Sequence, residues 1–304
     1  MVTNATLQIQ SVIYNNQLPS IVKALDSIDN AIQVARRDSH GLIGSVKVKY
    51  GDASPIPVLS SSDVDKLAEQ YKYAFSFSYH FFDENTGTSR GHNLLAENCS
   101  TEYILIINPD VILSPNYFTE ALAPFANQEL RVGLVEARQT PIEHPKEYDR
   151  ATGETSWGSG AAALVPTTVF QEVGGFDETC FFLYCDDVDL SWRIRLTGRR
   201  IIYRPAAVVY HAKRLNSKGR CEPTEAEVYY SAEAALFLAY KWSNQKLLDE
   251  ILSNFSENDD DVYQRAASSF LERLQAKNLP EALDKAHRIA SFEGFNYEKR
   301  RFTV

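Results

Sequence analysis

Several features that define whole classes of protein are missing from this sequence. No apolar stretch approaches the length that is needed to span a bilayer. Residues 1–10 lack the basic segment and apolar run of a signal peptide. The net charge of −9 disfavours nucleic-acid binding, which usually requires a basic face. We therefore expect a cytoplasmic protein, with peripheral contact at the inner face of the membrane left open.

Cysteine is also scarce. The four cysteines are Cys99, Cys180, Cys185 and Cys221. No two of them have the two-residue gap of a zinc knuckle or a thioredoxin-like site. We expect reduced, mostly buried thiols, as is usual in a cytoplasmic protein.

The composition is that of a globular protein. Hydrophobic residues make up 44% of the 304 residues and charged residues 23%, which is enough for a sizeable core. Short apolar runs alternate with amphipathic segments over the first two-thirds of the chain, a pattern that predicts an α/β fold with helices flanking an open sheet. The strands expected there are 7–14, 45–50, 73–82 and 103–107, and the helices 18–36, 62–71 and 91–99. The last strand is almost wholly apolar, which is typical of a parallel sheet buried on both faces.

Polar residues follow each of these strands, in a region where open α/β sheets bind their ligands. The four polar strand ends are Tyr14-Asn15-Asn16, Gly51-Asp52, Asp83-Glu84-Asn85 and Asn108-Pro109-Asp110. Any one of them alone fits an ordinary strand end. Together they predict a binding site along one rim of the sheet.

The rest of the chain divides into a mixed part and a helical part. We expect strands at 132–137, 161–165 and 200–209, with an irregular loop at 139–156 near the site. After Pro223 the pattern is helical, and the helices expected are 224–242, 244–255, 260–277 and 280–290. We therefore predict one α/β domain over 1–222 and a helical C-terminal extension over 223–304.

Two acidic motifs suggest chemistry. Asp110 follows a buried strand, where its carboxylate could hold a hard divalent cation. Asp186 and Asp187 follow an apolar run and precede a helix whose N-terminus favours their ionised form. An ionised carboxylate aimed at a bound sugar suits a general base, the role we favour for Asp187. For Asp186 we expect N-capping, and for Asp189 an i, i+4 ion pair with Arg193.

Three further features have both a functional and a structural interpretation. His211 ends a strand and could complete a metal site with Asp110, although a single histidine is more often structural. Gly158 and Gly160 would let a sugar approach the backbone, with Trp157 as a stacking wall. The glycines of the turn 174–178 also let the backbone pass close to a neighbouring group, either a ligand or another part of the chain. For both glycine segments, tight packing at a bend is an equally good explanation.

Taken in order, these motifs resemble glycosyltransferase family 2, the inverting enzymes of the GT-A fold. The closest similarity is to the bacterial branch that includes rhamnosyltransferases of surface-polysaccharide assembly. The matching stretch runs from about residue 7 to residue 242. Its most specific parts are Gly174-Gly175-Phe176-Asp177-Glu178, the run from Phe181 to Arg193, and Tyr210-His211, with earlier matches at 87–93 and 108–110.

The resemblance implies a Rossmann-like, mostly parallel sheet and a set of site residues. The residues implied at the nucleotide are Tyr14, Asp52, Asn85, Arg90, Asn93 and Asn108. The residues implied at the donor and acceptor sugars are Trp157, Gly160, Asp186 and Trp192. Asp110 and His211 would bind a divalent metal, Mn²⁺ or Mg²⁺, and Asp187 would be the catalytic base. Many relatives carry Asp where this chain has Asn108, a loss of one charge that should weaken cation binding.

The resemblance also implies substrates. The favoured donor is dTDP-rhamnose, with a UDP-hexose as the alternative, and the acceptor is a glycan or a lipid-linked glycan in surface polysaccharide or lipopolysaccharide synthesis. A non-catalytic scaffold that binds a nucleotide-sugar stays open as a second function. A glycosidase is disfavoured, because adjacent carboxylates do not flank a sugar from opposite faces. We expect the helical extension to serve oligomerisation or peripheral membrane contact.

Overall fold

The computed structural model describes residues 2–39, 41–143, 146–212, 222–294 and 296–297. The strands are β1 (Ala5–Ile13), β2 (Ile43–Asp52), β3 (Ser76–Phe81), β4 (Tyr103–Ile107), β5 (Val111–Leu113), β6 (Val132–Thr140), β7 (Glu154–Thr155), β8 (Ala162–Pro166) and β9 (Arg200–His211). The α-helices are α1 (Leu18–Asp38), α2 (Ser61–Tyr71), α3 (Gly87–Ala96), α4 (Tyr117–Leu122), α5 (Thr167–Glu172), α6 (Asp186–Leu196), α7 (Glu225–Lys241), α8 (Gln245–Ser256) and α9 (Asp261–Gln275).

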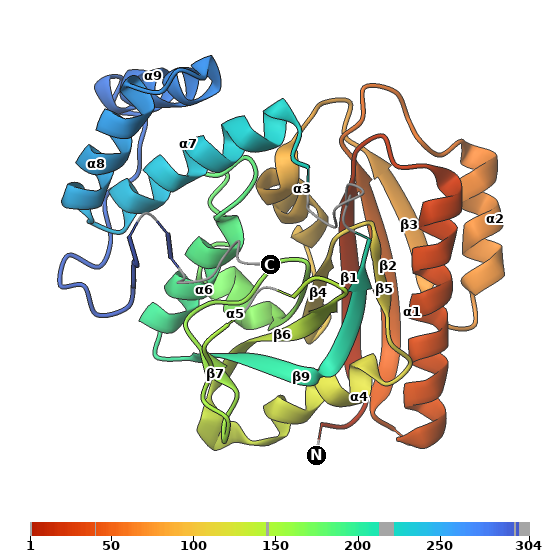
Figure 1. The fold of residues 1–304 in the computed structure, drawn as a ribbon. Coiled ribbons are helices and arrows are strands. Elements are labelled where there is room, and N and C mark those ends of the chain that lie inside the picture. Colours follow the sequence, from red (N-terminus) through yellow and green to blue (C-terminus); the bar gives the residue numbers. More distant parts are fainter. Residues whose placement is uncertain (1, 40, 144–145, 213–221, 295, 298–304) are drawn as a thin grey trace.

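The strands form one sheet in the order β3-β2-β1-β4-β8-β6-β9-β5, with β7 paired to β9 (Figure 1). The four strands β3, β2, β1 and β4 are parallel, and so is the pair β6–β9. The strands β8, β5 and β7 run antiparallel to their neighbours. The predicted α/β class and the helix-flanked sheet are confirmed, and the antiparallel strands lie in the part of the chain whose pattern is mixed.

The central strand β4 explains why the sheet is covered on both faces. Leu105 and Ile107 belong to the core cluster that α1, α2 and α4 complete. Ile104 and Ile106 belong to the opposite cluster, to which α5 and α6 contribute. Because successive strand residues point to opposite faces, an all-apolar strand requires a helical layer on each side. The run at 103–107 is such a strand.

The helical segment after Pro223 shares a core with α6. Trp192 of α6 packs edge-on against Trp242, with ring centroids 5.1 Å apart. Phe237 and Phe270 lie in the same cluster, so α7 and α9 are both joined to it (Figure 1). No helix in the described part of the chain is long and apolar enough to cross a membrane.

One predicted helix is wrong. Residues 280–290 form turns and irregular structure rather than a helix. The carboxylate of Asp284 accepts hydrogen bonds from the amides of Arg288, Ile289 and Ala290 at 2.8–2.9 Å. Aspartate side chains that bond nearby amides in this way compete with helical hydrogen bonding, and this local competition is invisible to a periodicity argument.

Candidate active site

Asp110 and His211 meet at the end of the sheet. Asp110 follows β4 and precedes β5, while His211 is the last residue of β9 and pairs with Val111. The His211 Nε2 atom lies 3.2 Å from Asp110 Oδ1, although the two residues are far apart along the chain. The antiparallel pairing of β5 with β9 therefore brings together the two side chains that were expected to share a metal.

The surroundings of His211 fit a metal ligand. Its Nδ1 atom lies 2.8 Å from Gln139 Oε1. Because an amide oxygen only accepts hydrogen bonds, this contact places a proton on Nδ1, so that Nε2, beside Asp110, is the nitrogen that could bind a metal. The side-chain amide nitrogen of Asn108 lies 3.4 Å from the same Nε2 atom. Such orientation by a second residue is typical of histidine ligands.

The protein offers few further ligands at this point. No group of three or more His, Cys, Asp or Glu side chains within the described ranges is arranged to hold a metal ion. Two side-chain ligands, one oxygen and one nitrogen, suit a cation whose remaining ligands come from a bound diphosphate and water. Asp110 and His211 therefore fit a cation that binds together with its substrate.

Asp187 lies at the start of α6 with its carboxylate held by backbone amides. Its Oδ2 atom accepts from the Gly160 amide at 2.9 Å, and Oδ1 accepts from the Val188 amide at 2.8 Å. The side chain is half-buried. These two amides fix the orientation of the carboxylate, and the role of Asp187 as a general base stays a prediction.

A short stretch of backbone connects Asp187 with the Asp110–His211 pair. The Gly160 backbone amide donates to Asp187. The carbonyl of the next residue, Ala161, accepts from the backbone amide of Asn108 at 3.1 Å. Asn108 in turn contacts His211. The three predicted residues Asp110, Asp187 and His211 are therefore linked through the start of β8, on one rim of the sheet.

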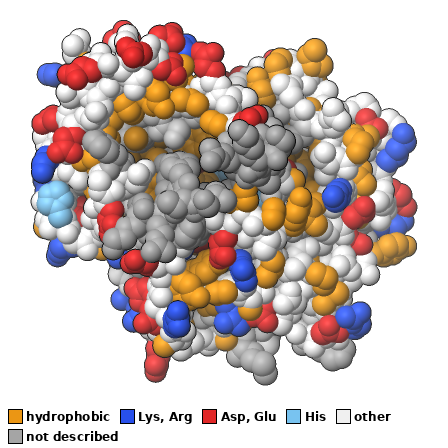
Figure 2. Space-filling view, in the orientation of Figure 1, with side chains coloured by type: hydrophobic (Ala, Val, Ile, Leu, Met, Phe, Trp, Pro, Cys, Tyr) orange, Lys and Arg blue, Asp and Glu red, His pale blue; other side chains and the backbone are white. Residues whose placement is uncertain are grey.

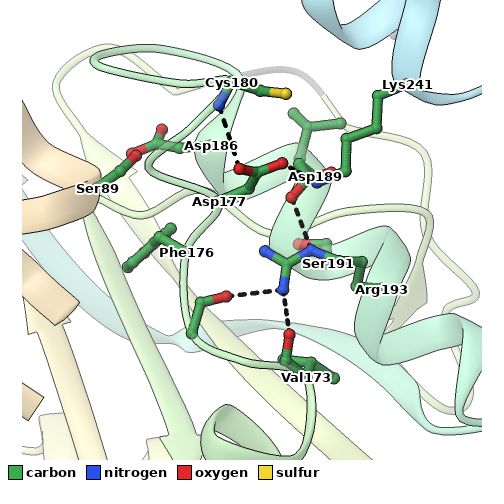
Figure 3. Close-up of polar contacts among 12 residues, drawn as sticks. Ser89, Val173, Phe176, Asp177, Cys180, Asp186, Asp189, Ser191, Arg193 and Lys241 are labelled. Atoms are coloured by element: carbon green, nitrogen blue, oxygen red, sulfur yellow. Dashed lines mark hydrogen bonds and ion pairs between the residues drawn. The ribbon is translucent and has the colours of Figure 1, made fainter. Parts of the chain in front are cut away.

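Asp186 has a different environment. Its Oδ2 atom accepts from the hydroxyls of Thr88, at 2.8 Å, and Ser89, at 3.2 Å, in the first turn of α3 (Figure 3). Burial, followed by repulsion from the Asp187 charge, raises the pKa of Asp186 to about 7. The expected N-capping role is wrong, because the N-cap is Cys185 and no side chain bonds at that position. Asp186 instead ties α6 to α3.

The backbone before the acidic pair is strained. Tyr184 and Cys185 have φ angles of +68° and +53°, which residues other than glycine rarely adopt. Each such residue costs on the order of 1–3 kcal/mol, and this cost persists only where the surroundings impose the conformation. Strain immediately before Asp186 and Asp187 supports a functional rather than a merely structural interpretation of this turn.

Asp189 forms the predicted ion pair with Arg193, at 2.7 Å. It is completely buried and also contacts Lys241 Nζ at 2.8 Å. Lys241 is 2.5 Å from Asp177, in the turn that precedes α6 (Figure 3). The last residue of α7 therefore bridges two carboxylates, one on α6 and one on the adjoining turn. Sequence reasoning missed this bridge, because Lys241 is far away along the chain.

The predicted nucleotide residues Tyr14 and Asp52 lie at the ends of adjacent parallel strands. Tyr14 is 50% exposed, while Asp52 is completely buried. The Asp52 carboxylate accepts from the amides of Ser54 and Val58, at 2.9 and 2.8 Å, and from the hydroxyl of Tyr79. In this arrangement Asp52 organises its own loop, and its contact with a base stays a prediction.

The other predicted nucleotide residues fall into two groups: Asn85 and Arg90 contact their own segment of the chain, whereas Asn93 contacts a distant one. The side-chain oxygen of Asn85 accepts from the Gly87 amide, and Arg90 pairs with Glu84 at the surface, at 2.8 Å. Asn93 points elsewhere: its side chain both accepts from and donates to the backbone of Phe176, at 2.9 Å for each bond. The structure thus gives Asn93 a fixed structural contact in place of the expected position at the nucleotide.

The same contact explains the double glycine of the 174–178 turn. A Cβ atom on Gly175 would lie 2.5 Å from Asn93 Oδ1, and its φ angle is +68°. Close packing at a bend, rather than ligand contact, therefore accounts for this glycine.

Two predicted sugar contacts are wrong as placed. Trp157 is 2% exposed and packs against Tyr297, with ring centroids 4.9 Å apart. Trp192 is completely buried in the α6–α7 core. Neither ring faces an open site, because both fill the interface with the helical segment. Gly160, in contrast, borders the Asp187 carboxylate directly: a Cβ atom there would lie 3.4 Å from the aspartate Cβ.

A buried ion pair beside the site was also missed. Glu136 of β6 and Lys146 of the following loop contact each other with side chains only 3% and 1% exposed. An acidic residue inside an apolar strand was a usable signal in the sequence. Of the cysteines, Cys99, Cys180 and Cys185 are buried and no disulfide joins any two of them, and Cys221 lies outside the described residues.

Comparison with known proteins agrees with this geometry. No family model matches the chain. The chain is 28% identical over 138 residues to the rhamnosyltransferase WbbL of Escherichia coli, a match that covers 36% of this chain and 52% of the relative. It is 39% identical over 87 residues to an N-acetylglucosaminyl-diphospho-decaprenol L-rhamnosyltransferase of Mycobacterium tuberculosis, covering 29% and 27%. The chain thus spans about half or less of these relatives' length.

A solved structure shows the fold. The crystal structure of GalNAc-T7 with UDP, GalNAc and Mn²⁺ superposes with a TM-score of 0.64 and 11% sequence identity, covering 94% of this chain and 57% of that one. The GT-A fold and the resemblance to the rhamnosyltransferase branch are therefore confirmed. The roles of individual site residues stay predictions.

Proposed function

We propose that this chain is an inverting glycosyltransferase that transfers a sugar from a nucleotide-sugar to a carbohydrate hydroxyl, with Asp187 as the general base. The observation that carries the proposal is the setting of the Asp187 carboxylate. It is half-buried, held by the amides of Gly160 and Val188, and linked through the start of β8 to Asp110 and His211. Similarity to rhamnosyltransferases supports the same conclusion.

The proposed reaction is a single displacement. Asp187 accepts the proton of the acceptor hydroxyl as that oxygen attacks the anomeric carbon. The bond from this carbon to the diphosphate oxygen breaks, and its electron pair leaves with the nucleoside diphosphate. Attack from the face opposite the leaving group inverts the anomeric centre. The two amide donors hold Asp187 in one orientation, which reduces the entropy lost when the acceptor is aligned.

Asp110 and His211 would hold a divalent cation, Mn²⁺ or Mg²⁺, at the diphosphate. Such a cation, when bound, neutralises the negative charge that develops on the leaving group. Gln139 keeps His211 in the tautomer that a metal requires, and Asn108 adds a neutral amide beside it. The Mn²⁺ in the crystal structure of GalNAc-T7 supports this assignment.

For the donor we propose dTDP-rhamnose, because both curated relatives are named rhamnosyltransferases. A UDP-hexose is the alternative, since the structural neighbour was crystallised with UDP. For the acceptor we propose a lipid-linked glycan, as the name of the mycobacterial relative suggests.

The surface next to Asp187 supports an acceptor with an apolar part. A cavity of about 540 Å³ begins at Tyr184 and Cys185 and continues between α7 and α8. Its apolar lining residues include Val228, Leu238, Leu247, Ile251 and Phe255. Figure 2 shows hydrophobic side chains gathered in this part of the molecule, below the acidic outer surface of α9. Such an acceptor would bring the protein to the inner face of the membrane.

The substitution Asp187→Asn tests the proposal. Asparagine keeps the shape and can still accept from the Gly160 amide, but it cannot take up the acceptor proton. We expect turnover to fall by about 10²- to 10⁴-fold, while calorimetry shows that donor binding in the presence of Mn²⁺ is preserved. Near-normal turnover in the variant would refute Asp187 as the base. Donor binding without product from any acceptor by the wild type would favour a scaffold.

A further inference from the structure

The buried pair of Glu136 and Lys146 lies directly behind the base. Glu136 is in the middle of β6, and Lys146 reaches it from the loop after β6. Burial raises the pKa of Glu136, whereas the Lys146 ammonium and the Ser159 amide lower it, and the charge of Asp187 raises it. The charge of Asp187 therefore acts on Glu136, although neither member of the pair belongs to a catalytic motif.

Both members of the pair contact residues 157–160, the segment whose Gly160 amide donates to Asp187. Lys146 Nζ donates to the carbonyl of Trp157 at 3.0 Å and lies 3.6 Å from the centre of the indole ring. Glu136 packs against the same segment: a Cβ atom on Gly158 would lie 3.4 Å from its Cβ. The Gly160 amide, two residues further on, donates to Asp187 at 2.9 Å. The buried pair thus contacts residues 157 and 158, directly before the backbone that bonds the base.

Stability alone is a weak reason for such a pair. Buried ion pairs often contribute no more than an apolar pair of similar volume, because both charges lose their hydration. An ion pair does, however, fix direction: the Lys146 ammonium, held by Glu136, donates to the Trp157 carbonyl at one end of residues 157–160. A well-packed apolar pair would leave that carbonyl without its donor.

We propose that Glu136 and Lys146 are positioning residues for Asp187, which they orient by clamping residues 157–160 so that the Gly160 amide holds the base. The geometric part of this inference stands on the contacts of the chain alone. Its kinetic consequence rests on the proposed function, so the experiment must separate the two.

A double-mutant cycle measures the kinetic part. Lys146→Met and Glu136→Gln each leave one buried charge without its partner, which distorts residues 157–160. We expect each to lower kcat by about ten- to hundredfold, with the donor KM within about twofold of the wild type. The double variant also lacks the Lys146 donor to the Trp157 carbonyl. Because the two residues act as one clamp, we expect its kcat to be as low as that of Lys146→Met and to fall no further.

The control variant is Arg199→Met, which breaks the Arg199–Glu172 pair (2.8 Å) away from the site. It should leave kcat unchanged. A pair with a purely structural role predicts a different pattern: lower melting temperatures in both single variants, but an unchanged kcat per folded molecule. That pattern, or a kcat in the double variant that is restored to the wild-type value, would overturn the proposal.

A measurement without turnover tests the geometric part. The chain has 14 glycines, so selective ¹⁵N-glycine labelling gives few NMR signals. The Gly160 signal is identified by its loss in Gly160→Ala. We expect it to shift in each single variant, and to shift in the double variant about as far as in Lys146→Met. An unmoved Gly160 signal would refute the inference even if the enzyme is active. The expected shifts in a protein without any turnover would uphold the inference and refute the function.

Discussion

Replacing Lys241 by methionine tests how α7 stabilises the helix that carries the proposed base. The Lys241 side chain is 5% exposed, and its ammonium contacts Asp177 at 2.5 Å and Asp189 at 2.8 Å. Methionine has nearly the same volume and no charge. The substitution therefore leaves the packing in place and removes the shared cation from two carboxylates (Figure 3).

The expected loss of stability follows from what each carboxylate retains. Removing one partner of a buried ion pair costs about 3–5 kcal/mol, because the remaining charge is left without compensation. Asp189 keeps Arg193, at 2.7 Å, and the indole N–H of Trp242, at 3.1 Å. Asp177 is 14% exposed and keeps the amide of Cys180. We therefore expect the lower end of the range, about 3 kcal/mol, which in a chain of this size lowers Tm by roughly 6–12 °C.

The pH dependence gives the prediction its sign. Burial by itself would raise the pKa of Asp177, but the Lys241 charge and hydrogen bonds from Cys180 outweigh it and hold this pKa below the ordinary value. A lowered pKa in the folded state stabilises the protein above the unfolded pKa of about 3.9 and is lost as the pH falls through the folded value. The difference between wild type and variant should therefore be largest at neutral pH and shrink below about pH 4.

Urea denaturation followed by circular dichroism, at pH 7 and at pH 3, measures both effects. The matched control is Lys246→Met on α8, where the lysine is 88% exposed and 3.8 Å from Glu250. An exposed pair of this kind contributes less than about 1 kcal/mol. The reasoning is refuted if Lys241→Met destabilises no more than this control, or if its effect does not depend on pH. The double variant Asp177→Asn/Lys241→Met should regain part of the loss.

Two further predictions concern the site. Burial and the Asp187 charge raise the pKa of Asp186 to about 7, so ionising Asp186 costs stability as the pH rises from its unfolded value to about 7. Asp186→Asn, whose amide oxygen can still accept from Thr88, should therefore raise Tm more at pH 8 than at pH 4; an equal change at both pH values would contradict this. Gln139→Leu removes the partner of His211 Nδ1. It should weaken Mn²⁺ binding, measured by calorimetry in the presence of a nucleoside diphosphate, about 10- to 100-fold. Unchanged affinity would contradict the role of His211 as a metal ligand.

The sequence predicted the central sheet well, because periodicity reports which faces of a strand are buried. The apolar run of β4 and the alternation in β2 predict strands, and both are strands of the observed sheet; which strands pair, such as β1 with β2 and β4, was not predicted. It failed at residues 280–290, where three backbone amides bond one aspartate. A hydrogen bond between a side chain and a local amide leaves no trace in a hydrophobic pattern.

At the site, the sequence identified acidic residues but not their partners. Trp157 and Trp192 looked like sugar contacts because aromatic residues stack on sugars, yet both are buried by the helical segment. The partners of Asp186 lie on α3, and those of Asp189 include the end of α7. Contacts between elements so far apart in sequence depend on tertiary packing, which a single sequence does not determine.

The first turn of α6 shows why this information decides function. Asp186, Asp187 and Asp189 share one helix dipole, so local electrostatics alone would treat them alike. Tertiary partners distinguish them: hydroxyls of α3 bond Asp186, and the cations Arg193 and Lys241 neutralise Asp189. Within the described part of the chain, the Asp187 carboxylate is held by backbone amides, and it alone of the three is only half-buried. An amide orients a carboxylate without supplying a counter-charge, and this is why we propose Asp187, rather than either neighbour, as the base.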